Sequence, residues 1–500
     1  MLALFYSLKE RQMKHTDKSI VSEDLLLNYH LMHPGGDSAP GDPNVAFWLG
    51  DTCHLYYILR HPWKDGQSYS FIHVTSEDML HWRWRTTILQ PSFTGHGMFS
   101  GTGFITKEGR PAAIYAGVSA PRHSFIAVAT DNRLSGWQKP YPVVPKGGPG
   151  GKDVGLLGDP DLFQVGDTYY AFSAAENLPL CKSTDLVNWT YVGPFMKHDM
   201  PDVAIGEDLS CANFFRLANK WMLLCISHSI GCRYYLGEWD GKAEQFVPET
   251  HGRMNWRRAG QSLTDPVYRD FFAPESVLTP DGRRVMWAWL ATLDPNMDLK
   301  TVQSLPRELS LDEEGSLRIR PLREIESLRY DAVMLDNVEV PPPRAKAESS
   351  GVHTAELPGD SCEIRITVDR SQAERRRFGF ELFAGGKREG LLVMLRPETG
   401  TICVGETEAP FSVADLPEGE NLDLRIYLDK YLVEVFANGR QAALAAHMTY
   451  RDGGTGLKVH AFGRDPNPIT IRKIEVWKLK PTNQGFLEAR QNRVWAPDID

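Results

Sequence analysis

Short apolar runs of strand length are the main pattern in the first part of the chain. Between about residue 28 and about residue 320 they alternate with turns rich in Gly, Pro, Asp and Asn, and no apolar pattern of helical period lies between them. Clear examples span residues 54–59, 112–116, 168–173 and 221–227. This pattern predicts an all-β fold.

A degenerate repeat runs through the same region. Residues 76–82 and 183–189 share the pattern Ser-x-Asp-x-x-x-Trp, and residues 131–137 form a weaker copy that begins with Asp and ends with Trp. In each copy a strand-like run comes first and the tryptophan closes a turn. Self-similar units of about fifty residues are typical of propeller blades, which are small antiparallel sheets around a central channel. We therefore predict a β-propeller.

A second region follows a change in composition. Residues 338–351 are proline-rich and then polar, which indicates a linker. Beyond them, residues 362–368, 390–396 and 424–436 alternate apolar and polar positions, and Asn438-Gly439 is typical of a hairpin turn, so we expect a β-sandwich. The predicted organisation is an N-terminal arm over 1–27, a propeller over 28–335, a linker over 336–350, a sandwich over 351–482 and a C-terminal tail over 483–500.

The composition of the chain argues against several classes of function. A net charge of −9 disfavours a protein that binds nucleic acid or an anionic membrane surface. The seven cysteines contain no C-x-x-C pair, which disfavours a disulfide framework and a zinc site and favours a reducing compartment. No apolar run has the length of a membrane span, and the apolar patch at the N-terminus is too short for a signal peptide. We therefore expect a soluble cytoplasmic protein.

Three motifs place a carboxylate beside Gly or Pro near the start of a predicted strand. They are Gly41-Asp42-Pro43, Gly158-Asp159-Pro160 and Gly206-Glu207-Asp208. Taken alone, each is explained equally well by an acid that caps a turn. Together, at the strand starts of different blades, they predict that Asp42, Asp159 and Glu207 meet at the central channel. Two carboxylates that flank a glycosidic bond are what sugar hydrolysis requires.

The order of these motifs resembles glycoside hydrolase family 32, the group of invertases, levanases and inulinases. Residues 28–34 and 42–44 resemble the opening motif of that family, residues 99–102 resemble a stretch that lines its fructose pocket, and Asp159-Pro160 resembles its Arg-Asp-Pro motif. The resemblance covers nearly the whole chain after the first 27 residues. Further segments with close counterparts span residues 234–241, 270–276, 304–310 and 424–436.

The resemblance implies a five-bladed propeller followed by a β-sandwich. It implies a retaining hydrolase that cleaves a β-fructofuranosidic bond in sucrose or a small fructan through a fructosyl-enzyme intermediate. In such an enzyme Asp42 is the nucleophile and Asp159 holds the fructosyl hydroxyls, and neither a cofactor nor a metal is required. The partner is then a disaccharide or small oligosaccharide, and the candidate substrate-binding residues are Asn44, Phe99, Ser100, Asp208 and Glu275.

The general acid is the main departure from the family pattern. An alignment on Cys211 puts Ser210 at the acid position, and a serine cannot protonate a glycosidic oxygen. We expect Glu207 to supply the acid instead, with Asp208 as the second candidate. The alternative is a non-catalytic carbohydrate-binding propeller that has lost its acid.

The wall that faces the sugar also departs from the family. Residues 39–41 replace a Trp-Met-Asn stretch before the nucleophile, and Gly158 replaces the arginine of Arg-Asp-Pro. These changes leave open a hydrolase or transferase that acts on another furanoside.

Overall fold

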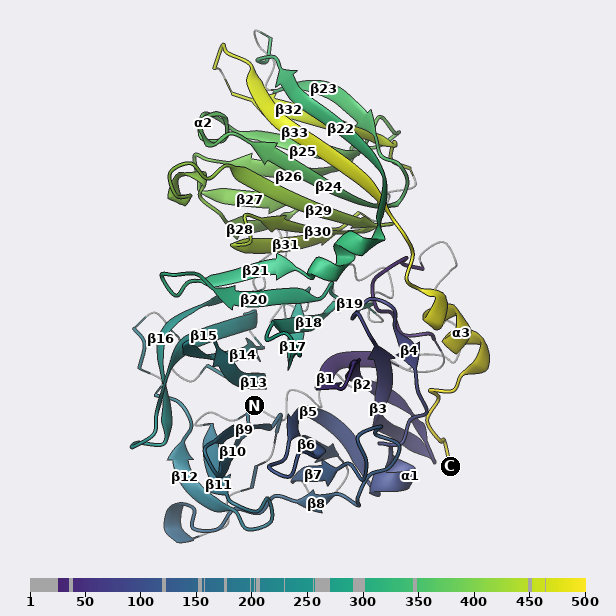
Figure 1. The fold of residues 1–500 in the computed structure, drawn as a ribbon, viewed down its shortest axis with the longest axis vertical. Helices are drawn as coiled ribbons and strands as arrows, with labels where there is room; N and C mark the ends of the chain where they lie inside the picture. The colour runs from purple at the N-terminus through teal and green to yellow at the C-terminus, as the bar shows by residue number, and fades with distance from the viewer. Residues whose placement is uncertain are drawn as a thin grey trace.

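The protein forms two all-β domains, one above the other in the view of Figure 1. This computed structural model describes residues 26–35, 39–118, 123–151, 155–156, 158–174, 178–197, 199–201, 203, 207–228, 230–254, 256, 270–290, 302–344, 349–447, 452–463 and 465–500. The predicted arm over 1–27 lies outside these residues except for Leu26 and Leu27, which are buried. In the described part of the chain, no helix combines the length and the apolar character needed to cross a membrane.

The first domain consists of consecutive small antiparallel sheets, as the repeat predicts. Its described residues form five such sheets, whose first strands face a common centre in Figure 1. The first two sheets contain β1 (Ala39–Leu49), β2 (Thr52–Trp63), β3 (Gly66–Ser76) and β4 (Arg83–Trp84), then β5 (Gly97–Ile105), β6 (Pro111–Val118), β7 (Ser124–Val128) and β8 (Tyr141–Pro142). The next two contain β9 (Asp161–Val165), β10 (Thr168–Phe172), β11 (Pro179–Ser183) and β12 (Thr190–Pro194), then β13 (Ser210–Leu217), β14 (Lys220–Ser227), β15 (Gly231–Asp240) and β16 (Gln245–Arg253). The fifth contains β17 (Phe272–Leu278), β18 (Arg284–Leu290), β19 (Val302–Gln303), β20 (Arg307–Leu311) and β21 (Leu317–Pro321).

The tryptophan-closed repeat is a recurring turn. The residue three positions before the tryptophan, which is Met79, Leu134 or Leu186, has a left-handed backbone with φ of 62°, 56° and 65° respectively. In two copies the aspartate caps the turn. Asp78 and Asp185 each accept hydrogen bonds from the backbone amides of the two residues just before the tryptophan. The sequence repeat therefore encodes one local structure used in three sheets.

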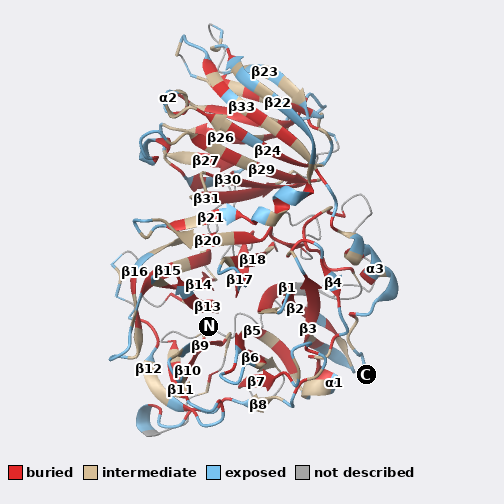
Figure 2. Ribbon diagram, viewed as in Figure 1, coloured by how far each residue is buried: buried red, intermediate tan, exposed pale blue. Residues whose placement is uncertain are grey.

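The second domain is a sandwich of two six-stranded sheets. One has the order β22-β33-β24-β29-β30-β31 and the other β23-β32-β25-β26-β27-β28. In Figure 2 buried residues, in red, alternate with less buried ones along many of these strands. The strands are β22 (Arg329–Val340), β23 (Ser349–Glu356), β24 (Ser361–Val368), β25 (Phe378–Ala384), β26 (Leu391–Arg396), β27 (Thr401–Val404), β28 (Thr407–Pro410), β29 (Leu422–Asp429), β30 (Leu432–Ala437), β31 (Gln441–Ala446), β32 (Gly456–Phe462) and β33 (Ile469–Leu479).

Two predicted boundaries need correction. Strand β22 pairs with β33, so the sandwich begins at Arg329, before the predicted end of the propeller at 335. The strand continues to Val340 and so occupies the first part of the predicted linker over 336–350. The predicted tail over 483–500 carries helix α3 (Gln484–Asn492), which packs against β4, and buries Trp495. The other helices are α1 (Pro91–Thr94) and α2 (Arg370–Ala373).

A buried charge cluster joins the two domains, and we call it the interdomain cluster. It consists of His30 and Arg307 from the propeller side and Asp429 and Glu434 from the sandwich. His30 Nδ1 lies 2.9 Å from Asp429, and Arg307 Nη2 lies 2.7 Å from Glu434. Burial alone lowers the pKa of His30, but its hydrogen bonds to Asp429 and Glu434 outweigh burial and raise that pKa to about 9. For Glu434, burial alone raises the pKa, but the charge of Arg307, the hydrogen bond and charge of His30 and the Leu305 amide together outweigh burial and lower that pKa to about 2.

Candidate functional site

Each of the first four sheets carries two polar or thiol-bearing residues two positions apart near the start of its first strand, and the fifth sheet contributes Glu275 alone. In the third sheet the first residue of the pair, Asp159, lies in the turn just before β9. Since strand side chains alternate between faces, two such residues share a face. The first residue of each pair belongs to a group that we call the outer set. The second residue belongs to a group that we call the inner set, which also includes Glu275. The outer set is Asp42, Ser100, Asp159 and Cys211, and the inner set is Asn44, Thr102, Asp161, Asn213 and Glu275.

β-Bulges lie at the outer positions. The pairing of β1 shifts on both sides of Pro43, that of β5 shifts between Met98 and Gly101, and that of β13 shifts between Ser210 and Asn213. A bulge adds a residue to one strand and turns its side chain in a new direction. The same device therefore aims Asp42, Ser100 and Cys211 towards one point.

The outer set converges on the thiol of Cys211. Ser100 Oγ donates to Asp42 Oδ2 at 3.2 Å, and Cys211 Sγ lies 3.7 Å from that same oxygen. Cys211 Sγ also lies 3.6 Å from Asp159 Oδ2, which accepts a hydrogen bond of 3.2 Å from the Cys211 amide. Burial, and then the negative charges of Asp159 and Asp42, raise the pKa of Cys211 well above its ordinary value, so the thiol stays protonated and donates.

The backbone at this point is strained. Asp159 and Cys211 have positive φ angles of 23° and 45°, a region that residues other than glycine rarely adopt. Such conformations persist only where the surrounding structure holds them, and they gather at functional sites.

The inner set forms a buried polar layer next to the outer set. Asp161 accepts hydrogen bonds of 2.6 Å from both Thr102 Oγ1 and the Phe214 amide. Asn213 Nδ2 lies 3.4 Å from Glu275 Oε1. Burial raises the pKa of Asp161 to about 6, and burial together with the charge of Asp161 raises that of Glu275 well above its ordinary value. The neighbouring Arg284 lowers the pKa of both acids, but by less than burial raises it, and burial lowers the pKa of Arg284 itself to about 10.

The predicted acid Glu207 is buried, with 7% of its surface exposed. Arg233 Nη1 lies 2.5 Å from Glu207 Oε1, and the Tyr235 hydroxyl donates to Glu207 Oε2 at 2.6 Å. Glu207 is therefore held by β15 and accepts on both oxygens. The second candidate, Asp208, pairs with His228 and keeps 41% of its side chain exposed. Ser210 is buried at the start of β13.

The remaining predicted residues lie around this group in different ways. Asn44 is buried and its Oδ1 accepts from the Gly101 amide at 3.2 Å, while its Nδ2 is a buried donor with no partner among the residues that the structure describes. Phe99 is half-buried and packs edge-on against Tyr69 at 5.1 Å between ring centroids. Of the predicted site residues, Asp42, Asp159 and Ser100 thus meet directly, Glu275 lies in the inner set, and Glu207 and Asp208 have separate partners.

Sequence reasoning missed two residues of this centre. Cys211 served only to align the chain, and Asp161 was not considered. The signal for Asp161 was present, because it is an acid two positions after Asp159, at the start of the strand that follows. No such signal exists for Cys211, because its direction depends on a bulge.

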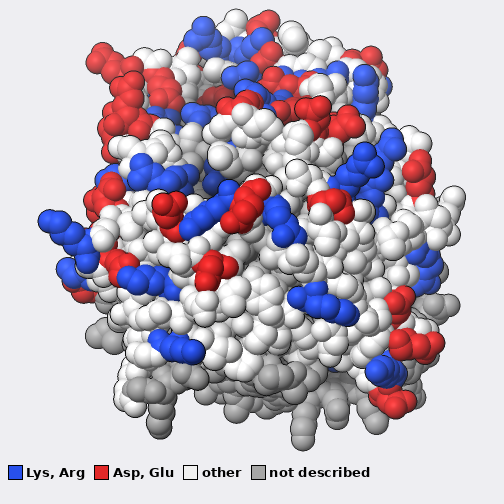
Figure 3. Space-filling view, turned by 60° about the horizontal axis from the view of Figure 1, so that its bottom comes forward, with Lys and Arg blue, Asp and Glu red and all other residues white. Residues whose placement is uncertain are grey.

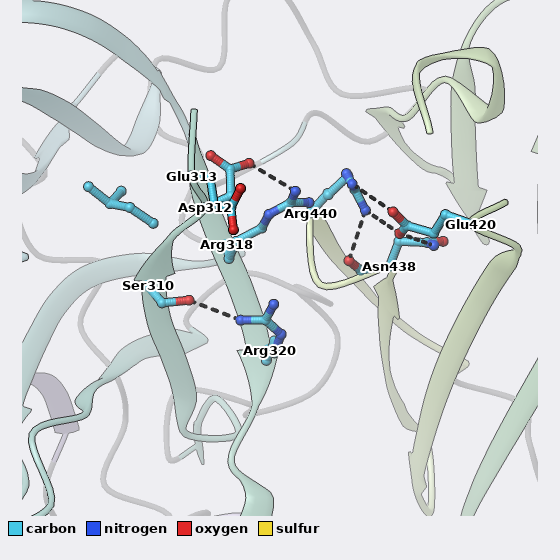
Figure 4. Close-up of a pocket in the computed structure, with 9 residues that line it drawn as sticks. Ser310, Asp312, Glu313, Arg318, Arg320, Glu420, Asn438 and Arg440 are labelled. Carbon is cyan, nitrogen blue, oxygen red and sulfur yellow. Dashed lines mark hydrogen bonds and ion pairs between the residues drawn. The ribbon is translucent and has the colours of Figure 1, made fainter. Parts of the chain in front are cut away.

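On the face shown in Figure 3, acidic and basic side chains are interspersed. A cavity of about 450 Å³ opens between the β20–β21 edge of the propeller and the sandwich, and none of its lining residues belongs to the outer or inner set (Figure 4). Its arginines are engaged there, since Arg318 pairs with Asp312 at 2.8 Å and Arg440 Nη2 donates to Glu420 at 2.9 Å.

Comparison with known proteins matches nearly the whole chain to one family. Residues 38–321 match the model of the glycosyl hydrolases family 32 N-terminal domain, and residues 324–478 match that of the family 32 C-terminal domain. A raffinose invertase of Escherichia coli is 25% identical over 472 residues, which cover 87% of this chain and 91% of the relative. A levanase of Bacillus subtilis is 24% identical over 542 residues, which cover 97% of this chain and 76% of the relative.

Solved structures match the fold at lower identity. The fructan 1-exohydrolase IIa of Cichorium intybus has a TM-score of 0.69 at 17% identity, covering 92% of this chain and 98% of its own. A family 32 β-fructofuranosidase of Bombyx mori, solved as a mutant in complex with sucrose, has a TM-score of 0.66 at 19% identity, covering 92% of this chain and 95% of its own. The propeller and sandwich of this chain are therefore the fold of these enzymes.

Proposed function

Because this chain belongs to glycosyl hydrolase family 32, and is accordingly a glycosidase, we propose that it hydrolyses the β-fructofuranosidic bond of sucrose or a small fructan at the outer set. The observation that carries this proposal is the convergence of Asp42 and Asp159, from two different sheets, on the thiol of Cys211. It places the proposed nucleophile beside a second carboxylate that can hold the sugar, and the acid that cleavage also requires is assigned to Glu207 below.

We assign the nucleophile to Asp42. Ser100 Oγ and Cys211 Sγ both contact its Oδ2. These two donors fix the direction of the carboxylate without neutralising its charge. A carboxylate oriented in this way is suited to attack the anomeric carbon and to form a fructosyl ester.

We assign the support of the sugar to Asp159 and Asn44. Asp159 accepts from the Cys211 amide, which holds its carboxylate beside Asp42. An ionised carboxylate there strengthens hydroxyl contacts as positive charge develops on the sugar ring. Asn44 Nδ2 is a buried donor that lacks a partner among the described residues, and a sugar hydroxyl would satisfy it.

We assign the general acid and base to Glu207. It is buried four residues before Cys211, and Arg233 and Tyr235 hold its carboxylate in place. In retention, this group protonates the leaving oxygen and then activates the incoming water. The expected separation between the carboxyl groups of Glu207 and Asp42 in the complex with substrate is about 5–5.5 Å.

The test separates protonation from nucleophilic attack. Glu207→Gln removes the proton and keeps the shape of the side chain, so we expect it to abolish sucrose hydrolysis. A fructoside with a leaving group that needs no proton, such as a nitrophenyl fructoside, should still release its leaving group. Asp208→Asn is the matched control, and it should leave both reactions close to the parent. Equal loss on both substrates would contradict the role of Glu207.

A second candidate function is supported by Ser210. This residue stands at the acid position of the alignment, and it is buried beside Cys211 at the start of β13. A propeller that binds fructosides without cleaving them fits that replacement. Saturable binding of sucrose by calorimetry, together with no turnover of sucrose or of the nitrophenyl fructoside, would establish this function in place of hydrolysis.

A further inference from the structure

Asp161 is a buried acid for which the proposed reaction has no use. It lies at the start of β9 with 2% of its surface exposed. Its Oδ1 accepts from Thr102 Oγ1 at 2.6 Å and from the Leu162 amide at 2.8 Å, and its Oδ2 accepts from the Phe214 amide at 2.6 Å. One carboxylate thus ties β9 to β5 through one oxygen and to β13 through the other.

The two strands that Asp161 joins carry the two side chains that contact Asp42. Ser100 precedes Thr102 by two positions on β5, and Cys211 precedes Phe214 by three positions on β13. Ser100 Oγ and Cys211 Sγ lie 3.9 Å apart, and both contact Asp42 Oδ2. The spacing between β5 and β13 therefore decides whether both contacts are made together.

Strand β13 needs such a hold because it is bulged and strained. Cys211 has a φ of 45° and lies inside the bulge, where an extra residue is left out of the ladder. Asp159 binds the Cys211 amide at 3.2 Å and Asp161 binds the Phe214 amide at 2.6 Å, one on each side of the bulge centre. Asp161 at the start of β9 and Asp159 in the turn before β9 thus hold the bulged segment at both of its ends.

We propose that Asp161 is a positioning residue for the reaction, which holds β5 and β13 so that Ser100 and Cys211 keep their contacts with the nucleophile. This role rests on the proposed function of Asp42. Asp161 acts through the strands and not on the sugar, because its hydrogen bonds go to Thr102, Leu162 and Phe214.

The kinetic test uses substitutions that keep side-chain shape. Asp161→Asn turns one acceptor oxygen into a donor, so either the Leu162 amide or the Phe214 amide, which now bind different oxygens, loses its acceptor. At a temperature well below Tm, we expect kcat on sucrose to fall about 10- to 100-fold while KM stays within about threefold. Thr102→Val removes one link and should lower kcat less, and Thr102→Ser keeps the hydroxyl and should restore it. The Thr102 pair serves the same purpose if Asp161→Asn does not fold.

A second readout does not depend on turnover. Cys211 is the only one of the seven cysteines that is not buried. Its thiol donates to two carboxylates, so it should react slowly with iodoacetamide, as followed by peptide mass spectrometry. Asp161→Asn and Thr102→Val should speed this alkylation, because the first weakens the link of Asp161 to the strands and the second removes its link to β5, so that β5 and β13 no longer keep their spacing. Thr102→Ser keeps the hydroxyl and should leave the rate unchanged.

The outcomes separate this proposal from the proposed function. A parent protein that turns over no fructoside refutes the hydrolytic function, and the alkylation rates still test the positioning role. Variants with a lower Tm but with the kcat, KM and alkylation rate of the parent would overturn the proposal, because Asp161 would then be only structural.

Discussion

The interdomain cluster and the inner set both bury acids beside a cation, yet they shift those acids in opposite directions. At the domain interface the pKa of Glu434 falls to about 2 and that of His30 rises to about 9, so the charged forms are favoured. In the inner set the pKa of Asp161 rises to about 6 and that of Glu275 rises well above its ordinary value, so burial works against the charged forms. Burial is common to both regions and does not explain the difference.

The difference lies in whether each buried acid has a cation as its direct hydrogen-bonding partner. At the interface, two cations face two acids at hydrogen-bonding distance, with side chains that are at most 1% exposed. In the inner set, Arg284 is stacked on Phe215 at 4.2 Å and hydrogen-bonds Ser276 rather than either acid. Direct partners outweigh desolvation at the first site and do not at the second. The interface is therefore organised for stability, and the channel keeps poorly balanced acids next to the proposed reaction centre.

The largest expected effect comes from Asp42 in the outer set. Asp42→Asn keeps the shape of the side chain but removes the nucleophile, so turnover of sucrose should fall at least about a thousandfold. Calorimetric unfolding should show that the variant remains folded. Near-parental activity on any fructoside would rule out the covalent role of Asp42.

The next largest effect is expected from a substitution that breaks the interdomain cluster. Glu434→Gln leaves Arg307 buried without its countercharge and leaves His30 paired with Asp429 alone, and breaking a buried pair in this way costs about 3–5 kcal/mol of unfolding free energy. Urea unfolding measures this loss. The control is Asp423→Asn, which breaks the largely exposed pair of Asp423 with Arg365 and should change stability little. A loss no greater than that of the control would mean that the cluster is not stabilising.

A smaller effect is expected at Glu275. Its pKa is raised well above the ordinary value, so it is neutral under conditions in which Glu434 is charged. Glu275→Gln keeps a neutral group and keeps an acceptor for Asn213, and the unfolding free energy should change by less than about 1 kcal/mol or rise slightly. A loss as large as that of Glu434→Gln would remove the contrast between the two regions.

The sequence predicted the fold well where burial follows a local pattern. Strand-length runs and the tryptophan repeat identified the sheets, because each blade turn depends on residues that are close in the chain. Strand β22 was missed because it is an exposed edge strand, with Tyr330, Val333 and Met334 all more than 40% exposed, so its apolar positions do not alternate with burial. The proline-rich stretch after it favoured a linker instead.

The sequence predicted only those features of the site that depend on residues within one strand and the turn before it. Asp42 and Asp159 follow from Gly and Pro beside a carboxylate, and their approach follows from propeller geometry. The contact of both with Cys211 depends on a bulge, and one inserted residue changes the face on which a side chain lies. The partners of Glu207, which are Arg233 and Tyr235, lie on a strand distant in sequence, and no local pattern connects them.

The smallest expected effect is a change in how stability depends on pH. A carboxyl whose pKa is raised to about 6 on folding binds more protons in the folded state between its unfolded value and that pH. Its contribution to stability is therefore present at low pH and is lost as the pH rises through about 6. Glu434 behaves in the opposite way: its pKa is lowered to about 2, so its contribution to stability is lost as the pH falls towards that value. Asp161→Asn removes the first of these contributions, so the slope of unfolding free energy between about pH 4 and pH 6 should become more positive by at most about 1.4 kcal/mol per pH unit. Urea unfolding at a series of pH values measures that slope. An unchanged slope would mean that Asp161 is already ionised in the folded protein at pH 4, and the two regions would then hold their acids in the same way.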